Sequence, residues 1–567
     1  MLDSHLSSTL LALGLLALPT NASRAETQVQ RGEYLTRVGD CAACHTQAGG
    51  QAFAGGASIR SPFGPIYAPN ITPDKDAGIG SWSDDDFYRA LHEGLGKDRK
   101  LLYPAMPYQW YTKVTRDDVL AIKAYLFSLP PSQQKNRETK LRFPFDVRAG
   151  LAVWNAAYFK PGEFKPDPAK PADVNHGAYL VEGLAHCGDC HTPRGFAMET
   201  LNAKSYSGGV VDNWYAPNIT SDKTRGIGSW PNDELLSYLK TGLYKDKGPI
   251  VGPMGQVVHE SLSYLSDQDL NAIVAYLRNL KPIADYQPER VAAVSEAHSA
   301  GATAYLGHCA FCHGRDGKGR AGAIPALEGN DLVNGKGPES IIRVVLGGLI
   351  ARGAYAPMPA VGQEMSDQDV ADAVNFARNA WSNNSPPTAE SGLVAKIRAE
   401  TNGILAEKSS ANDANDSCRS GDDGTPVPPV KDANGELEGA LGKIDEVNML
   451  QSVSTLIKST RKLAPKASQA EIINGLTQAY CRAQFKAGIG GKADGVRLLN
   501  QFSQLIYAEL VSPQLAAAQS ISMGQAPQTQ ATPSPAVVTP TSQPETKPHY
   551  ALQHRPVHRH LRRGRWR

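Results

Sequence analysis

The chain has 567 residues, of which 41% are hydrophobic and 20% are charged. This length is too great for one hydrophobic core and predicts about three or four domains of ordinary size. The formal net charge of +2 is nearly balanced, so the bulk composition excludes a protein built to bind nucleic acid.

The first 25 residues are predicted to be a signal peptide. An apolar run from Leu10 to Leu18 precedes small residues at Ser23 and Ala25. Met1 to Leu6 lacks the usual Lys or Arg, which leaves an uncleaved anchor as the alternative, but the run is shorter than the ~20 residues that span a bilayer. We therefore expect a periplasmic protein, associated with the outer face of the inner membrane.

Three copies of the motif Cys-x-x-Cys-His follow. They are Cys41-Ala42-Ala43-Cys44-His45, Cys187-Gly188-Asp189-Cys190-His191 and Cys309-Ala310-Phe311-Cys312-His313. Two thiols at this spacing on a helical turn reach the two vinyl groups of a porphyrin edge, and the histidine supplies the proximal iron ligand. One Cys-x-x-Cys would also suit a redox dithiol or half a zinc site. Three copies with histidine, in an exported chain, predict three covalently bound haem c groups.

A sixth iron ligand is expected in each repeat of an electron carrier, and methionine is the expected type. A methionine shortly after a proline follows each motif: Met106, Met254 and Met358. Equivalent placement in three repeats outweighs the usual interpretation of a methionine as core filler. The competing candidates are Met365 in the third repeat and His259 or Met198 in the second. The histidines directly before a motif, His186 and His308, cannot easily reach back over the same iron.

Two further segments occur in both the first and the second repeat. Tyr67-Ala68-Pro69-Asn70-Ile71-Thr72 returns as Tyr215-Ala216-Pro217-Asn218-Ile219-Thr220, and Gly78-Ile79-Gly80-Ser81-Trp82 returns as Gly226-Ile227-Gly228-Ser229-Trp230. The indoles of Trp82 and Trp230 suit either a hydrogen bond to a haem propionate or packing in the core. The third repeat lacks both segments, and there the carbonyl of Pro325 is expected to fix the imidazole of His313.

Each repeat is expected to close with an amphipathic helix. The predicted helices are Asp117 to Leu126, Ser266 to Leu280 and Ser366 to Ala380, with Ser266 and Ser366 as N-caps. Apolar residues at helical spacing should form one buried stripe. We expect this stripe to pack against the helix that carries Gly-x-Tyr-Leu before the haem motif.

The pattern predicts a mainly α protein with three tandem cytochrome c domains. The expected divisions are a signal peptide (1–25), domain 1 (26–130), a connector (131–173), domain 2 (174–282), domain 3 (283–384), a helical C-terminal region (390–520) and a disordered Pro/Thr-rich and basic tail (521–567). The connector carries several aromatic residues, which we expect to be buried between the haem domains.

Residues 31 to about 381 resemble the three-haem cytochrome c subunit of membrane-bound alcohol, gluconate, sorbitol and aldehyde dehydrogenases. The resemblance rests on Gly39 to Thr46, the Asn-Ile-Thr and Gly-Ile-Gly-x-Trp segments, Tyr103 to Tyr108, and the Phe-Pro-Phe and Trp-Asn segments of the connector.

The resemblance implies a separate catalytic subunit with flavin or pyrroloquinoline quinone that oxidises a CH–OH or aldehyde donor. Electrons would then pass through the haems to ubiquinone or another acceptor. It implies proximal ligands at His45, His191 and His313, and distal ligands at Met106, Met254 and Met358. Similar cytochromes serve molybdenum hydroxylases, so the donor class stays open.

The C-terminal region departs from this family pattern. Ser468 to Phe485 and Ala493 to Leu510 are the best predicted helices, and Ser468 with Glu471 has the form of a capping box. Cys418 and Cys481 suit either a disulfide or two unpaired thiols. The last 14 residues hold six Arg and three His, which suits a solvated tail or peripheral contact with anionic lipid.

Two other functions remain open from the sequence. A haem enzyme of peroxidase or oxygen-reducing type would need at least one five-coordinate iron, which carbon monoxide would bind. A haem-binding structural or sensor module would place the function in residues 390–567. Hydrolase motifs and nucleotide-binding glycine loops do not occur in the sequence, which favours an electron-transfer subunit without chemistry of its own.

Overall fold

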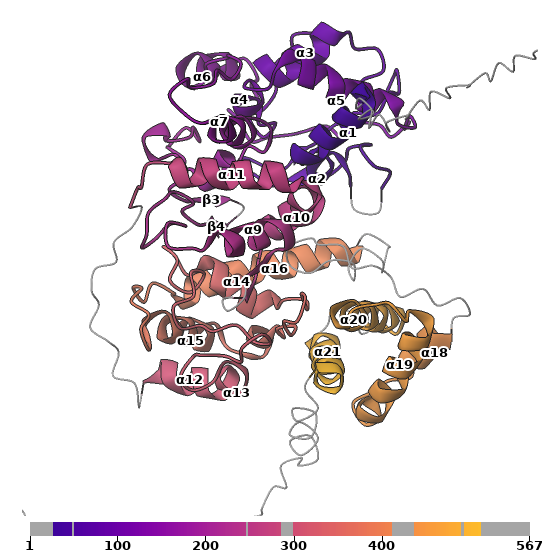
Figure 1. Ribbon diagram of the computed structural model, residues 1–567. Coiled ribbons are helices and arrows are strands. Elements are labelled where there is room, and N and C mark those ends of the chain that lie inside the picture. The colour runs from indigo at the N-terminus through magenta and orange to yellow at the C-terminus, as the bar shows by residue number, and fades with distance from the viewer. Residues whose placement is uncertain are drawn as a thin grey trace, which may run out of the picture. The chain divides into compact units, whose positions relative to one another are not determined.

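Helices dominate the fold, with only short two-stranded sheets between them (Figure 1). The computed structural model describes residues 27–47, 50–211, 213–244, 248–284, 299–410, 436–488 and 493–511. Within these ranges, none of the helices combines the length and the hydropathy needed to cross a bilayer. The predicted signal peptide, Cys418 and the predicted Pro-rich and basic tail lie outside the described residues.

The first repeat begins with a helix and the haem-motif turn. Its elements are α1 (Gln28–Val38), α2 (Cys41–His45), β1 (Ser58–Ile59), β2 (Ile66–Tyr67), α3 (Asp84–Glu93), α4 (Tyr108–Tyr111) and α5 (Arg116–Ser128). Helix α6 (Gly150–Tyr158) lies in the connector. Strands β1 and β2 pair antiparallel, with Ser58 opposite Tyr67.

The second repeat has the same order with additions. Its elements are α7 (Ala172–Tyr179), η1 (Leu180–Leu184), α8 (Gly188–His191), η2 (Asn202–Lys204), β3 (Gly209–Val211), β4 (Trp214–Ala216), α9 (Asn232–Thr241), β5 (Leu243–Tyr244), β6 (Gly248–Pro249), α10 (Pro253–Glu260), η3 (Leu262–Tyr264) and α11 (Asp267–Asn279). The two strand pairs are antiparallel, with Gly209 opposite Ala216 and Leu243 opposite Pro249.

The third repeat is shorter and purely helical in its main elements. It comprises α12 (Ala300–His308), α13 (Ala310–His313), α14 (Glu339–Gly347), η4 (Val361–Glu364) and α15 (Asp367–Asn379), followed by α16 (Ser391–Ser410). A separate group of helices, which we call the C-terminal module, comprises α18 (Glu436–Leu441), α19 (Met449–Leu463), α20 (Gln469–Lys486) and α21 (Ala493–Val511). The described residues all fall within one compact unit, Met1–Gln519.

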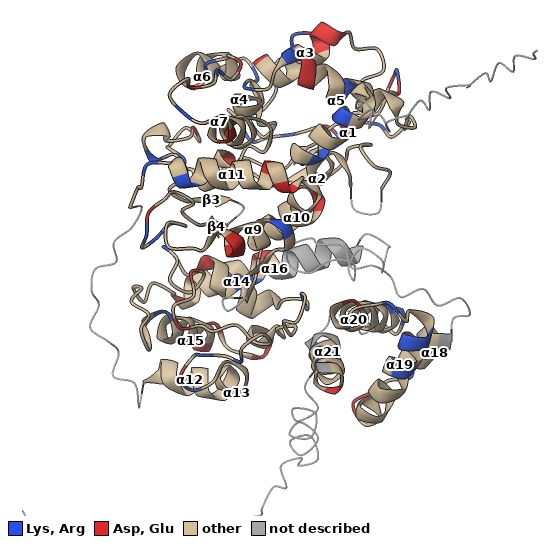
Figure 2. Cartoon of the chain, viewed as in Figure 1, with Lys and Arg blue, Asp and Glu red and all other residues tan. Residues whose placement is uncertain are grey.

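The predicted helix caps are present. The side chains of Ser266 and Ser366 accept hydrogen bonds from the N–H groups of Asp269 and Asp369, each at 3.1 Å, at the starts of α11 and α15. Acidic residues follow in the first turns, where the helix dipole favours them. The same arrangement at α3 appears as red at its beginning (Figure 2).

A glycine lets the first and last helices of each repeat approach closely. A Cβ atom on Gly32 or Gly177 would lie 1.9 Å from the carbonyl oxygen of Ala121 or Ala272, and one on Gly301 would lie 2.6 Å from that of Asp372. The pairs α1–α5, α7–α11 and α12–α15 are therefore in contact in all three repeats. This confirms the predicted packing of the closing helix.

The first two repeats exchange hydrogen bonds reciprocally. Tyr34 of α1 donates its hydroxyl hydrogen to Asp269 of α11, and Tyr179 of α7 donates to Asp118 of α5 at 2.6 Å. Arg31 and His176, one turn earlier on the same helices, contact Asp118 and Asp269 respectively. One continuous core cluster joins the two repeats, so they form one structural body.

The prediction that the connector aromatics are buried is wrong for Phe143, Phe145 and Tyr158, which are exposed. Phe143 is 80% exposed, and α6 buries none of its residues. The connector is instead attached along one side by polar contacts. Trp154 donates to the carbonyl of Ala197 at 2.8 Å, and Asn155 accepts from Tyr108 at 2.7 Å. Some apolar contacts accompany these bonds: Phe145 stacks on Phe63 with ring centroids 3.7 Å apart, and Phe164 packs against the core of the first two repeats.

The C-terminal module has its own apolar core. Leu441, Val453, Leu476, Phe502 and Ile506 are among its buried side chains. The predicted capping box is present, because Glu471 accepts from the N–H of Ser468 at 2.7 Å and donates its own N–H to the Ser468 hydroxyl at 3.2 Å. Cys481 is buried and disulfide-bonded.

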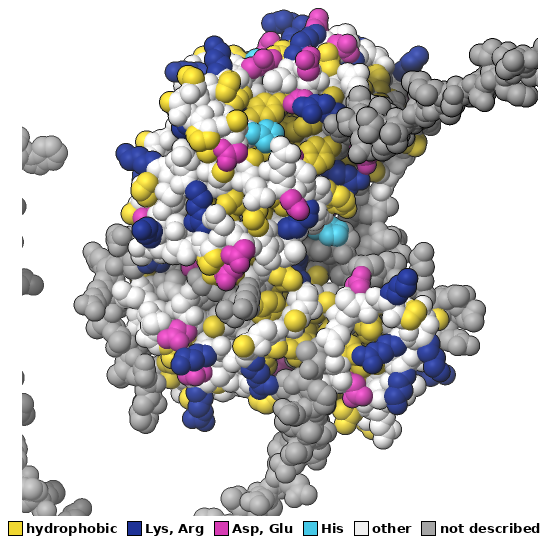
Figure 3. Space-filling model, in the orientation of Figure 1, with side chains coloured by type: hydrophobic (Ala, Val, Ile, Leu, Met, Phe, Trp, Pro, Cys, Tyr) yellow, Lys and Arg dark blue, Asp and Glu magenta, His cyan; other side chains and the backbone are white. Residues whose placement is uncertain are grey.

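Charged side chains of both signs are interspersed with apolar ones on the face shown in Figure 3. This mixture agrees with the formal net charge of +2 for the whole chain. The viewed surface therefore lacks the single-sign field that nucleic acid or other polyanions attract.

Candidate haem sites

Each haem-motif histidine is held by a proline carbonyl. The Nδ1 atoms of His45, His191 and His313 lie 2.8, 2.7 and 3.0 Å from the carbonyl oxygens of Pro69, Pro217 and Pro325. A hydrogen bond from Nδ1 fixes the ring orientation and leaves Nε2 as the nitrogen available to a metal. The predicted contact of Pro325 with His313 is thus confirmed.

Burial also sets the protonation of these histidines. Burial lowers the pKa of His45, His191 and His313 below the usual histidine value, and the proline carbonyls oppose this only in part. A lowered pKa means a neutral imidazole at neutral pH. Neutral imidazole is the form that binds iron.

The motif cysteines are free thiols within the described structure. Burial raises the pKa of the thiols of Cys41, Cys44, Cys187 and Cys190 to about 12. Such thiols stay protonated at neutral pH, which does not suit a reactive dithiol. Covalent thioether attachment of haem remains the use that fits the buried cysteine pairs.

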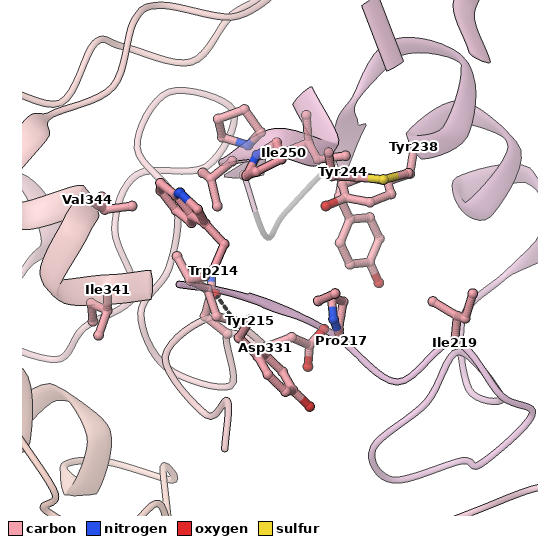
Figure 4. Close-up of a pocket in the computed structure, with 18 of the residues that line it drawn as sticks. Trp214, Tyr215, Pro217, Ile219, Tyr238, Tyr244, Ile250, Asp331, Ile341 and Val344 are labelled. Carbon is pink, nitrogen blue, oxygen red and sulfur yellow. Dashed lines mark hydrogen bonds between the residues drawn. The ribbon is translucent and has the colours of Figure 1, made fainter. Parts of the chain in front are cut away.

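The second and third sites open into one cavity. Cys187, Cys190 and His191 line it together with Cys309 and His313. Figure 4 shows Trp214, Tyr215, Tyr238 and Tyr244 around this space, with Ile341 and Val344 of α14 on another side. Most of the lining is apolar, as a porphyrin requires.

Two predicted methionine ligands line this same cavity. Met254 lies in the first turn of α10, after Gly252 and Pro253, rather than in a loop before the helix. Met358 lies in an extended segment whose backbone pairs with Leu349 through hydrogen bonds of 2.8 and 2.9 Å. Each therefore shares the cavity with the histidine of its own repeat.

The competing methionine of the third repeat is also at the cavity. Met365 lines it, is 6% exposed and belongs to the core cluster of the third repeat. Its place in that core agrees with the prediction of a packing residue. Met106 of the first repeat lies in the turn before α4 and packs against the core cluster that Cys41 also contacts.

The other competing residues have separate contacts. His186 lines the cavity, but its Nδ1 lies 2.9 Å from the carbonyl of Leu184, and its ring packs edge-on against Tyr111. His308 is exposed. Met198 has a left-handed backbone with a φ of 64°, and its carbonyl accepts a hydrogen bond from Arg194 at 2.9 Å.

The first and second sites meet through Trp110. Its indole N–H donates to Asp189, inside the second haem motif, at 3.1 Å. A Cβ atom on Gly188 would lie 2.1 Å from the Trp110 ring, so only glycine fits there. Trp110 lies in α4, the helix that directly follows Met106, and it therefore connects this helix to the second haem motif.

Sequence reasoning missed Trp110 and the carbonyls of Pro69 and Pro217. The repeated Tyr-Ala-Pro-Asn-Ile-Thr segment was the available signal, because a segment that recurs after the first two motifs, with its proline 24 and 26 residues beyond the motif histidine, indicates a shared partner. Trp230 lines the cavity and stacks on Tyr244 with ring centroids 4.3 Å apart.

The residues present fit covalent haem. Paired buried thiols, a neutral histidine with Nδ1 engaged, and an apolar cavity with a methionine on its wall are the donor set and surroundings that haem c requires. This fit is strongest for the second and third sites, where these groups line one space.

Comparison with known proteins gives the same answer. The family described as "Cytochrome c" matches residues 29–130 and 175–281, and the family described as "Cytochrome C oxidase, cbb3-type, subunit III" matches residues 296–376. Cytochrome c domains imply haem c bound through thioethers, in agreement with the motifs.

Longer similarities cover about two thirds of the chain. The chain is 39% identical over 413 residues to the cytochrome c subunit of alcohol dehydrogenase (quinone) from Gluconacetobacter polyoxogenes, covering 69% of this chain and 88% of the relative. It is 38% identical over 424 residues to the gluconate 2-dehydrogenase cytochrome c subunit of Pantoea cypripedii, covering 70% and 96%. It is 37% identical over 415 residues to the fructose dehydrogenase cytochrome subunit of Gluconobacter japonicus, covering 67% and 85%. The chain belongs to the family of cytochrome c subunits of alcohol, gluconate and fructose dehydrogenases.

Proposed function

We propose that this chain is a periplasmic three-haem cytochrome that carries electrons from a partner dehydrogenase to ubiquinone or another respiratory acceptor. The observation that carries the proposal is the continuous apolar cavity shared by the second and third sites. The Trp110 contact between the first and second sites supports a relay through all three.

The chain's own residues have distinct roles in this relay. His45, His191 and His313 would bind the three irons from one side, with the proline carbonyls holding each ring in place. Met106, Met254 and Met358 would bind from the other side. When bound, haem iron supplies a one-electron couple, and the apolar lining keeps water away from it.

Filled axial positions favour electron transfer over chemistry at the iron. This separates the proposal from a peroxidase or oxygen-reducing enzyme, which needs an open position. The donor is proposed to be a catalytic subunit with flavin or pyrroloquinoline quinone, because the named relatives serve alcohol, gluconate and fructose dehydrogenases. A molybdenum hydroxylase is the second donor class.

Ligation can be tested on full-length protein matured with its haems. Mass spectrometry should show three added haems, and the reduced protein should not bind carbon monoxide. Met254→Ala and Met358→Ala should each open one iron to carbon monoxide. Met365→Ala is the matched control for the third site and should leave binding unchanged. Carbon monoxide binding by the unaltered protein, or fewer than three haems, would overturn the three-site assignment.

Electron delivery can be tested with a partner and an acceptor. Copurified dehydrogenase subunit and its substrate should reduce all three haems, and a soluble ubiquinone analogue should reoxidise them. Oxidation of substrate by this chain alone would contradict a purely electron-transferring role. A variant lacking residues 390–567 that delivers electrons as before would exclude a sensor function in the C-terminal region.

A further inference from the structure

The C-terminal module contacts the third haem site, although it lies beyond the residues that either cytochrome family matches. The module's core cluster includes Ala351, and Ala323 and Ala356 pack against it. Ala323 lies in the segment that follows the third haem motif. Ala351 and Ala356 lie in the segment that precedes Met358. The module therefore touches the walls of that site rather than a remote surface.

Two amide side chains of the module form hydrogen bonds with the segment on the methionine side of the third site. Asn474 of α20 accepts from the N–H of Ala351 at 3.1 Å and donates to the carbonyl of the same residue at 2.7 Å. Gln504 of α21 donates to the carbonyl of Pro357 at 2.5 Å. Pro357 directly precedes Met358. The module thus holds both ends of the stretch from Ala351 to Pro357, which directly precedes this methionine.

The proximal wall is tied to the same contacts. The N–H of Ala356 donates to the carbonyl of Ala323 at 2.9 Å, and Pro325, two residues further, holds His313. This backbone hydrogen bond therefore joins the segment on the histidine side of the site to the segment on the methionine side.

The module also contains a buried hydroxyl group. Tyr507 of α21 is 2% exposed, and its hydroxyl has no hydrogen-bond partner among the described residues. Burial raises the pKa of Tyr507, and the positive charge of Arg320 opposes this shift.

We propose that the C-terminal module is a clamp on the third haem site, in which Asn474 and Gln504 are positioning residues that hold Met358 against the iron. This inference rests on the proposed ligand role of Met358. An iron–thioether bond is weak, and a ligand on an extended segment leaves readily unless that segment is restrained. Because methionine raises the reduction potential, the clamp keeps the third haem at the higher potential of the bound state.

The test uses full-length haem-loaded protein with Asn474→Ala or Gln504→Ala. Both residues are only partly buried, and alanine favours helix, so the module should fold. Each variant should shift the equilibrium between methionine-bound and methionine-free iron at one site by about tenfold. The expected readouts are a lower potential for one of three steps in a redox titration, a weaker red absorption band of methionine-bound ferric haem, and new carbon monoxide binding.

Gln469→Ala is the matched control. Gln469 also donates its amide to a backbone carbonyl, that of Leu510 at 3.1 Å, but this bond lies within the module. The control should leave all three potentials unchanged. Met358→Ala identifies which step belongs to the third haem.

The outcomes separate the clamp from the ligand assignment. If Met358→Ala alters one potential while Asn474→Ala and Gln504→Ala behave like Gln469→Ala, the clamp is wrong and the ligand stands. If Met358→Ala changes neither potential nor carbon monoxide binding, the ligand assignment fails and the clamp falls with it. If the module variants and the control all shift the same step, the effect is general module stability, which also overturns the clamp.

Discussion

Asn70 and Asn218 fix the backbone segments whose carbonyls orient two haem-motif histidines. Asn218 is 2% exposed, accepts from the N–H and hydroxyl of Thr220 at 2.9 and 2.7 Å, and donates to the carbonyl of Ile283 at 2.7 Å. Asn70 makes the equivalent bonds to Thr72 and Ser132. Each asparagine directly follows the proline that holds the histidine, so it acts on the iron ligand through one peptide unit.

Asn218→Ala should lower the free energy of unfolding by about 2–3 kcal/mol, because it leaves buried polar groups unsatisfied. Urea unfolding of the haem-loaded protein measures this. Asn202→Ala is the comparison, since Asn202 is exposed and should change stability by no more than about 0.5 kcal/mol. Equal effects of the two substitutions would show that the Asn218 bonds contribute nothing specific.

At this scale the sequence predicts side chains better than backbone groups. The cysteines and histidines follow from a motif whose chemistry depends on their side chains. The carbonyl of Pro325 was also predicted. Those of Pro69 and Pro217 were not, because a backbone carbonyl is common to every residue and only its place in the fold makes it useful.

The close contact between the first and last helix of each repeat depends on one glycine. Gly32, Gly177 and Gly301 stand at the point where the first helix of each repeat crosses the last. Only hydrogen fits between these backbones. The glycine of Gly-x-Tyr-Leu is therefore a packing requirement in the first two repeats, and Gly301 takes its place in the third repeat, which lacks that motif.

Gly177→Ala should destabilise the second repeat by about 1–3 kcal/mol, because the added methyl overlaps the carbonyl of Ala272 and the helices must separate. Thermal unfolding followed by circular dichroism measures the loss. Gly150→Ala is the matched control, since nothing lies within 4 Å of a Cβ atom there and alanine favours helix α6. The control should be neutral or stabilising, and a similar loss in both would contradict the crossing argument.

Element positions were largely predictable, but the connector was not. The closing helices α5, α11 and α15 follow from periodicity and capping residues, which are local. Whether Phe143 and its neighbours are buried depends on what lies over them in three dimensions, and composition does not contain that information. The aromatic content predicted burial throughout, whereas Phe143 is exposed, Phe164 packs against the core, and polar bonds of Trp154 and Asn155 help to hold the segment in place.

Across the molecule, the first two repeats are joined by the exchanged tyrosines. Tyr34 and Tyr179 also accept backbone N–H groups from Ser266 and Thr115, at 3.1 and 3.2 Å. Each tyrosine thus caps the closing helix of the other repeat. The pattern could not be read from either repeat alone, because each tyrosine finds its partner in the other copy.

Tyr34→Phe and Tyr179→Phe should each lower the free energy of unfolding by about 1–3 kcal/mol, since each removes one hydrogen bond to a buried aspartate, which keeps only its contact with His176 or Arg31. A double variant tests coupling between the two bonds. We expect the combined loss to differ from the sum by at least about 0.5 kcal/mol, because the bonds share one interface. Strict additivity in urea unfolding would indicate two independent contacts.

The same tyrosines predict a pH dependence. Burial, and then the hydrogen bond to an aspartate, raises the pKa of Tyr34 and of Tyr179 above the ordinary value of 10.0. Their stabilising contribution is complete below the unfolded pKa of about 10 and is lost as the pH rises through the folded pKa. The free energy of unfolding should fall above pH of about 10, and less steeply in the Tyr34→Phe, Tyr179→Phe double variant. Identical slopes would contradict this assignment.

The single enclosure around the second and third sites has a consequence for charge. An electron added to one iron in an apolar space is poorly screened from its neighbour, so the second reduction there becomes harder than the first. Two haems bound in this enclosure would titrate over a wider span of potential than the same haems kept apart. The pair would then hold one electron over a broad range of conditions, ready either to receive another or to release the one it has.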